Sequence, residues 1–189
     1  MVVVVCRLDL RNNYLTTLTE FTFRDLSSLR YLFLTNNRIY RIERRALRHL
    51  PQLLYLVLRG NPLDDVDRLH FHSPSTLSYV DMSECGLTRV PRGLPAALRY
   101  VQLRRNNLTT LDAGTFSECL DVNILVLDEN NIQTVHDNTF ADMSNLQQVR
   151  RVQTPSAINS ASYPRREYQP KWGVVLRLGN KGTNGSFRL

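Results

Sequence analysis

The sequence has few cysteines, little glycine or proline and no long apolar run, and each shortage excludes a class of protein. Its 189 residues include 3 Cys, 8 Gly and 8 Pro. Three cysteines cannot form a disulfide-dense scaffold, and an odd number leaves at least one thiol unpaired within the chain. With 42% hydrophobic residues, the composition excludes a collagenous or disordered chain. No apolar run approaches the ~20 residues that span a bilayer, so we expect one domain with a sizeable core.

The first residues do not form a secretory signal. The run MVVVVC is followed at once by Arg7 and Asp9. It lacks the apolar region of roughly 7–15 residues and the small-residue cleavage site of such a signal. The sequence therefore either has no signal or begins after its cleavage point.

The excess positive charge lies at the C-terminal end. The formal net charge is +7, and residues 150–189 contain eight basic residues and one acidic one, Glu167, whereas residues 1–149 contain 16 of each. Prolines and the stretch GNKGTNGS favour a flexible tail over residues 153–189. A brief apolar run from Val174 to Leu178 predicts at most one strand there, which could also dock over the open end of the body.

One pattern repeats along the body. The template L-x-x-L-x-L-x-x-N-x-L recurs six times from residue 5 onward, at steps of 24 residues except for one step of 21, and a partial seventh strand follows at Leu146 and Val149. The alternating L-x-L centre predicts a short strand with one buried face. The asparagine predicts a turn, because its amide can bond backbone groups that the turn leaves unpaired. Since no repeat can bury its apolar face alone, we expect a solenoid over residues 1–152.

Stacking of the repeats predicts two columns of buried side chains. One is an asparagine ladder in which Cys85 takes one place, and the other lies on the convex side, where Cys119 joins the core. Both cysteines are then buried, inert thiols, and only Cys6 could pair outside the chain. The ladder comprises Asn13, Asn37, Asn61, Asn106 and Asn130, and the convex column comprises Phe23, Leu47, Phe71, Phe116 and Phe140.

The template resembles that of the leucine-rich repeat family over residues 5–149. The triplets GTF at 114–116 and NTF at 138–140, with the 24-residue length, resemble the typical extracellular subclass. Segment 87–109, with its VP..LP..L spacing, is similar to the small leucine-rich proteoglycans and to the first repeats of neuronal ectodomain proteins. The resemblance implies an α/β-type solenoid, a horseshoe with short parallel β-strands on its concave face and irregular or 3₁₀ segments on its convex face.

Motifs for catalysis or cofactor binding are missing. There is no Gly-rich phosphate loop, nucleophile elbow, CxxC or HExxH pattern, so we predict neither an enzyme nor a cofactor. His70 and His72 flank Phe71 and would need two further ligands to hold a metal ion. The acidic stretch 64–67 is interpreted as a solvated turn, with loose calcium binding as the alternative.

The concave face carries the most informative residues. Reading outward-facing positions strand by strand gives tyrosine in four consecutive repeats, with arginines beside them. Tyr and Arg are enriched at interface hot spots, although stacked tyrosines also stabilise a sheet without any partner. The candidate partner-binding residues are Tyr31, Phe33, Tyr55, Arg59, Tyr79, Asp81, Tyr100, Arg104 and Asp128.

These observations favour a non-enzymatic protein-binding module, extracellular or at the cell surface. The alternative is a structural extracellular-matrix component that binds fibrous protein or anionic glycan, partly through the basic tail. A cytoplasmic scaffold is the third hypothesis, suggested by the missing signal and the unpaired cysteines. No motif for reading nucleic-acid bases is present. The triplets at Asn107 and Asn184 are candidate glycosylation sites.

Overall fold

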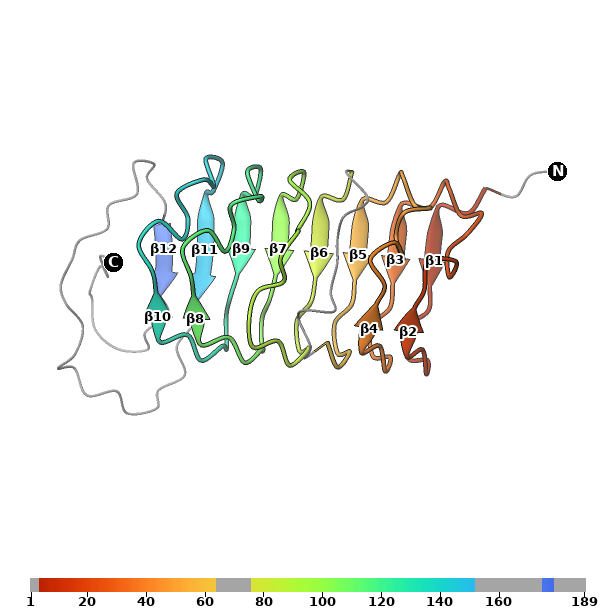
Figure 1. Cartoon of the computed structure of the whole chain (residues 1–189), viewed down its shortest axis with the longest axis horizontal. Helices are drawn as coiled ribbons and strands as arrows, with labels where there is room; N and C mark the ends of the chain where they lie inside the picture. The colour runs from red at the N-terminus through yellow and green to blue at the C-terminus, as the bar shows by residue number, and fades with distance from the viewer. Residues whose placement is uncertain (1–3, 64–75, 152–174, 179–189) are drawn as a thin grey trace.

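The computed structural model describes residues 4–63, 76–151 and 175–178. Eight short strands form one continuous parallel sheet along the length of the molecule (Figure 1). We call the solvent side of this sheet the concave face and the opposite side of the coil the outer side. In sheet order the strands are β1 (Arg7–Asp9), β3 (Tyr31–Phe33), β5 (Tyr55–Val57), β6 (Tyr79–Asp81), β7 (Tyr100–Gln102), β9 (Ile124–Val126), β11 (Gln148–Arg151) and β12 (Val175–Leu178).

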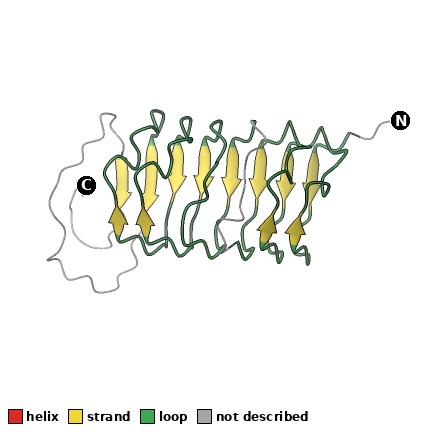
Figure 2. Cartoon of the chain, viewed as in Figure 1, coloured by secondary structure: helices red, strands yellow, loops and turns green. Residues whose placement is uncertain are grey.

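The outer side holds two further parallel pairs of strands, β2 (Thr17–Leu18) with β4 (Arg41–Ile42) and β8 (Thr110–Leu111) with β10 (Thr134–Val135). One pair lies near the N-terminal end and the other near the C-terminal end (Figure 1). Irregular or 3₁₀ segments are expected on this side, and in the described residues it consists of irregular turns and loops with these short strands, without 3₁₀ or other helix (Figure 2). Each pair forms where two equally long repeats are adjacent, because equal lengths keep their outer backbones in register.

The core lies between the long sheet and the outer side. In the strands of the long sheet from β1 to β11, the second residue points inward, so that Leu32 pairs with Leu56 and both are fully buried. On the outer side, Phe116 and Phe140 stack with ring centroids 5.9 Å apart. The expected convex column is thus present where it is described, while Phe71 lies outside the described residues. A repeating apolar template has therefore produced one continuous core.

The asparagine ladder is present in the interior of the coil. Nδ2 of Asn37 donates to the carbonyls of Leu34 in its own repeat and Leu10 in the preceding one, both at 2.9 Å. The expectation of burial was wrong for Asn13, which is exposed and lies in the first of the described repeats, at the end of the long sheet. Asn130 is half-buried. The ladder therefore joins repeats most strongly in the middle of the molecule.

The expected tail is described only at 175–178. This segment forms β12, which pairs in parallel with β11, placing Leu176 opposite Val149 (Figure 1). The rest of 153–189, with Asn184, lies outside the described residues, as do the histidines at 70 and 72 and the acidic stretch 64–67. The sheet thus continues past the last repeat strand.

Candidate functional site

Four tyrosines form a continuous stack across the concave face. Their strands pair residue for residue, so that Tyr31, Tyr55, Tyr79 and Tyr100 lie in one row. The ring centroids are 5.3, 5.0 and 5.1 Å apart along the row, and neighbouring rings are inclined by 22° to 30°. Tyr31 and Tyr55 are 38% and 39% exposed, and the other two are half-buried. The predicted row is therefore real as an arrangement, and we call it the tyrosine ladder.

Tyr79 is the most constrained member of the ladder. Its hydroxyl lies 3.3 Å from Oε1 of Gln102 and donates to it. Burial raises the pKa of Tyr79 to about 12, and the nearby Asp81 carboxylate acts in the same direction. The hydroxyl therefore stays protonated at neutral pH, and its hydrogen bond to Gln102 fixes its orientation beside the stacked rings.

Two predicted contact residues lie below the surface rather than on it. Asp81 is 7% exposed and Asp128 is 5% exposed. Oδ1 of Asp81 accepts a hydrogen bond of 2.9 Å from the backbone N–H of Ser83, which holds this short side chain against its own turn. Oδ2 of Asp128 lies 3.5 Å from Nη2 of Arg150, and its Oδ1 has no hydrogen-bond partner among the described residues. Asp81 therefore supports the turn beside the tyrosine ladder, whereas Asp128 lies buried beside Arg150.

A chain of ion pairs runs along the edge of the ladder. Nη2 of Arg59 lies 2.8 Å from Oε1 of Glu84, and Nη1 of Arg105 lies 3.2 Å from the same oxygen. Arg105 and Arg104 both bond Glu129. These guanidinium groups lower the pKa values of both glutamates. Because all five residues reach solvent, the network adds little stability, but it fixes the directions of Arg59 and Arg104.

The sequence interpretation missed three members of this network. Each of the three residues directly precedes the asparagine-ladder position of its repeat. Their backbone φ angles are positive, at 57° for Glu84, 54° for Arg105 and 55° for Glu129. This left-handed backbone turns their side chains sideways, toward the neighbouring repeat. The signal was present in the sequence, since the position before the asparagine alternates in charge over three repeats.

Phe33 lies at the N-terminal end of the concave face, under two arginines. The guanidinium carbon of Arg7 is 4.7 Å from the Phe33 ring centroid, and that of Arg11 is 5.8 Å away. Arg11 also binds Asp9 through two hydrogen bonds of 2.8 and 2.6 Å, and this contact lowers the pKa of Asp9 to about 2. Phe33 therefore presents a cation-covered ring, unlike the open tyrosines.

The candidate glycosylation residue Asn107 is accessible. Its side chain is exposed, while its backbone N–H donates to the carbonyl of Leu87 at 2.8 Å. Leu108 is buried and Thr109 is exposed, so both polar residues of the triplet face solvent. The geometry leaves room for a glycan on this flank.

All three cysteines are free thiols. Cys85 occupies the asparagine-ladder position of its repeat, where its Sγ contacts the carbonyls of Leu58 and Ser83 at 3.4 and 3.3 Å. Burial raises the pKa of Cys85 to about 12 and that of Cys119 to about 11. Cys6 is exposed. The two inner thiols are thus poor nucleophiles.

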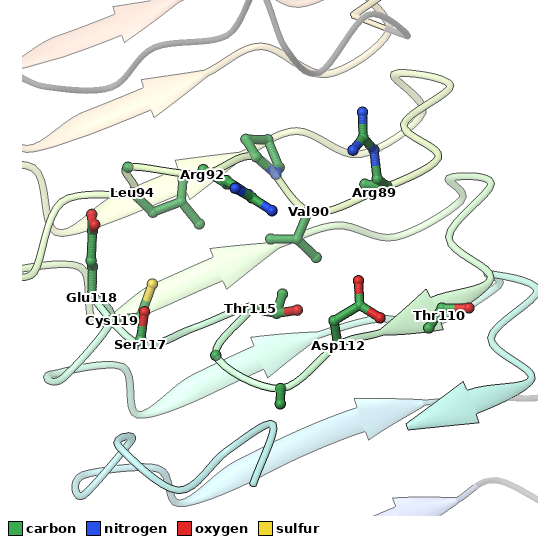
Figure 3. Close-up of a pocket in the computed structure, with 14 residues that line it drawn as sticks. Arg89, Val90, Arg92, Leu94, Thr110, Asp112, Thr115, Ser117, Glu118 and Cys119 are labelled. Carbon is green, nitrogen blue, oxygen red and sulfur yellow. The ribbon is translucent and has the colours of Figure 1, made fainter. Parts of the chain in front are cut away.

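A cavity of about 490 Å³ opens on the outer side, where the 21-residue repeat adjoins a longer one. Figure 3 shows Arg89 and Arg92 on the shorter loop, across from Asp112, Thr115 and Ser117 on the next loop. The lining brings arginines, carboxylates and hydroxyls of two successive repeats together. This cavity therefore reflects the shortened repeat.

Metal clusters and membrane-spanning helices are both absent from the described residues. No group of three or more His, Cys, Asp or Glu side chains there is placed to hold a metal ion. In the same part of the chain, no helix has the length and apolar character needed to cross a bilayer.

Comparison with known proteins identifies similar sequences. A family model described as "Leucine rich repeat" matches residues 5–63 and 96–150. The chain is 30% identical over 145 residues to Podocan of Mus musculus, covering 76% of this chain and 20% of that protein. It is 31% identical over 146 residues to Keratocan of Bos taurus, and the match covers 75% of this chain and 35% of that protein. With Podocan-like protein 1 of Homo sapiens it shares 34% identity over 130 residues, covering 68% and 25%. The chain thus spans between a fifth and about a third of the length of these small leucine-rich proteoglycans.

Solved structures show the same fold. TLR13 in its complex with ssRNA13 aligns with a TM-score of 0.69 at 22% identity, over 77% of this chain and 21% of that one. Human 5T4 aligns with a TM-score of 0.51 at 21% identity, over 78% of this chain and 69% of that one. Both likenesses extend over most of the described coil.

Proposed function

The chain belongs to the leucine-rich repeat family, and on this premise we propose that it is a non-enzymatic binding protein that holds a protein ligand against its concave face. A solenoid of this kind offers a wide, rigid surface built from one short strand per repeat. Its parallel strands fix the spacing of the side chains that a partner would meet. Recognition would then depend on which residues occupy the solvent-facing rows.

The tyrosine ladder is the observation that carries this proposal. Stacked rings offer a large contact area with little side-chain freedom left to lose on binding, because each ring is already held by its neighbours. The hydroxyls add donors at the tips. Tyrosine in such a central, rigid position is a frequent source of binding energy.

The ion-pair network supplies a charged rim beside the ladder. Arg59 and Arg104 are directed by Glu84 and Glu129, so that the rim carries both signs of charge. Rim charges chiefly set the rate of association and the choice of partner. A protein ligand with an aromatic or aliphatic centre and mixed charges at its edge fits this arrangement best.

An extracellular setting is supported by two observations. The relatives reported above are small leucine-rich proteoglycans, and the Asn107 triplet is exposed on a flank of the coil. Expression through a secretory route tests this setting, since glycosidase treatment should then increase the electrophoretic mobility of Asn184→Gln but not of Asn107→Gln/Asn184→Gln, which lacks both candidate sites. A parent chain that is exported without such a shift would contradict glycosylation at this residue.

Affinity capture tests the binding function. The full chain, immobilised, is exposed to solubilised extracellular-matrix proteins, and captured proteins are compared with those held by the Tyr55→Ala/Tyr79→Ala variant. The double variant should lose partners that Tyr14→Ala retains, because Tyr14 lies in a loop, 76% exposed, away from the ladder. Equal capture by all three proteins would exclude the ladder as the site.

A matrix component that holds anionic glycan through its basic tail is the second candidate. The observation that favours it is the segregation of charge, with eight basic residues and one acidic residue in 150–189. Deleting 153–189 should lower the salt concentration at which the chain elutes from a heparin column. An unchanged elution position would remove this candidate.

A further inference from the structure

The outer side of the second repeat is densely basic. Five arginines lie within eleven residues of one coil, from the flank through β4 to the turn that follows, and all five are exposed. Residues 1–149 have no net charge as a whole, so their total charge does not reveal this local excess of positive charge. We call the five residues the arginine surface: Arg38, Arg41, Arg44, Arg45 and Arg48.

Nearby acids neutralise this surface only in part. Glu20 bonds Arg48 and lies 4.0 Å from Nη1 of Arg45. Glu43 lies 3.7 Å from Nη2 of Arg41. Two carboxylates thus meet three guanidinium groups, and Arg44 makes no ion pair within the described residues. Among the residues that the structure describes, the contacts of this surface thus leave an excess of positive charge.

Equivalent segments in the C-terminal half have the opposite charge. Residues 106–149 contain no lysine or arginine. Their outer loops instead expose five acids, which are Asp112, Glu118, Asp121, Asp137 and Asp142. Within the described ranges, the outer side is therefore basic toward the N-terminal end and acidic toward the C-terminal end, and a long polyanion would be attracted to the first and repelled from the second.

We propose that the arginine surface binds a sulfated polysaccharide. Guanidinium groups pair with two oxygens of a sulfate at once, which lysine does not do, and every basic residue of the body is arginine. Successive arginines along one coil suit an anion whose charges repeat along a chain. This site lies on the opposite side of the coil from the concave face, so it is independent of the protein ligand proposed above.

The aromatic residues here favour a polysaccharide over single-stranded nucleic acid. Nucleic acids without sequence preference are held by rings on which bases stack. The ring of Tyr14 instead carries the guanidinium of Arg38 at 4.7 Å, and that of Phe21 carries Arg24 at 5.9 Å. These rings direct the arginines, leaving charge pairing as the main source of binding.

Paired variants of the full chain test this proposal. Binding of a heparin dodecasaccharide is measured by surface plasmon resonance at several salt concentrations. Arg44→Ser/Arg45→Ser should weaken binding by roughly five- to tenfold at about 0.15 M salt and should flatten the salt dependence by about one to two units of slope. Arg92→Ser/Arg99→Ser removes the same charge from exposed positions elsewhere and should change affinity by less than about twofold.

A second variant makes the test work in both directions. Glu20→Gln/Glu43→Gln removes the local acids while keeping side-chain acceptors, and it should strengthen binding by roughly the same factor. Thermal melting of every variant confirms the fold, since all substituted side chains are exposed or half-buried. The tail is present throughout, so its own contribution cancels between variants.

Three results would overturn the proposal. One is equal weakening by both arginine pairs, which would mean that only total charge matters. Another is tighter binding of single-stranded DNA of matched charge with the same dependence on Arg44 and Arg45. The third is unaltered heparin binding by Arg44→Ser/Arg45→Ser with altered sedimentation, which would make the surface a contact between copies of the chain.

Discussion

Oδ1 of Asn61 accepts a hydrogen bond of 3.0 Å from the backbone N–H of Ile39, in the preceding repeat. Nδ2 of the same side chain donates to the carbonyls of Leu34, at 2.9 Å, and Leu58, at 2.6 Å. One buried amide therefore satisfies three backbone groups in two repeats. Because such groups are costly to leave unpaired away from water, the asparagine ladder stabilises each repeat boundary as well as each turn.

Asn61→Ala should consequently be among the most destabilising substitutions in the body. It leaves the buried N–H of Ile39 without an acceptor, at about 1–3 kcal/mol where water cannot reach the group, and it removes one of the two donors from each of the carbonyls of Leu34 and Leu58, which keep Asn37 Nδ2 and Cys85 Sγ. We expect a loss of about 3 kcal/mol in the free energy of unfolding, measured by urea denaturation. Asn13→Ala is the matched control at an exposed ladder position and should cost less than about 1 kcal/mol. Equal costs would show that cross-repeat bonding is unimportant.

Gly60 provides a second test of how neighbouring repeats fit. It has φ of 70°, and a Cβ added there would lie 2.5 Å from Oδ1 of Asn36. Gly114 has φ of 72° with open space around it. Gly114→Ala should therefore cost only the left-handed backbone penalty of about 1–2 kcal/mol. Gly60→Ala should cost more, because Asn36 must also move.

A double-mutant cycle isolates this steric part. Adding Asn36→Ala should remove most of the difference between the two glycine variants, with stability measured by urea denaturation. If Gly60→Ala remains equally costly without the Asn36 side chain, the obstacle is backbone strain alone.

The repeat template predicted the strands and the tyrosine ladder because both follow from spacing. A 24-residue step places Tyr31 opposite Tyr55, and parallel pairing then requires their rings to stack. The template could not predict the burial of Asp81 and Asp128. A short carboxylate that bonds its own turn or a neighbouring arginine stays near the backbone, and an alternation rule contains no information about such contacts.

The arginine surface was missed for a different reason. Charge was summed over residues 1–149, and a sum removes any separation between the ends of the coil. The residues were nonetheless visible in the sequence, since Arg38 and Arg48 delimit five arginines against one glutamate. The position of β12 does not follow from the sequence, because the five-residue run from Val174 to Leu178 does not indicate which edge it will join. Pairing with β11 depends on tertiary structure.

Thiol labelling should separate the three cysteines. Burial raises the pKa values of Cys85 and Cys119 to about 12 and about 11, while Cys6 is exposed. Iodoacetamide at pH 8 should therefore add one group to the native chain and three in urea, as counted by intact mass. Cys6→Ser should remove native labelling altogether. Rapid native modification of a second thiol would mean that the coil opens locally.

Stability should fall at alkaline pH. A group whose pKa is raised by folding stabilises the native state below its unfolded pKa, and this contribution is lost as pH rises toward the folded pKa. The ordinary values are 9.0 for the thiols and 10.0 for Tyr79, and the folded values are about 11 to 12. The free energy of unfolding should therefore decrease from about pH 9 upward.

Tyr79→Phe measures how much of this alkaline loss of stability comes from ionisation of the Tyr79 hydroxyl. The substitution keeps the stacked ring and removes the ionising hydroxyl, so the decrease between pH 10 and 12 should become shallower. Tyr40→Phe, on the exposed flank, is the control and should leave the slope as in the parent chain. Urea denaturation at each pH gives the comparison, and identical slopes for both variants would argue against a folded environment that resists ionisation at Tyr79.

Binding measurements with ladder variants decide between a recognition surface and a device that only stabilises the sheet. Tyr55→Ala and Tyr79→Ala should each cost about 1–2 kcal/mol of binding to a captured protein partner, by titration calorimetry, because central aromatic residues contribute most to such interfaces. The core beneath stays intact, since these side chains face away from it. Tyr14→Ala should bind as the parent chain does.

Arg59→Glu should slow association and change its salt dependence more than it changes dissociation, because it alters the charged rim. Lower melting temperatures with normal affinity in both ladder variants would instead show that the tyrosines act on the sheet alone.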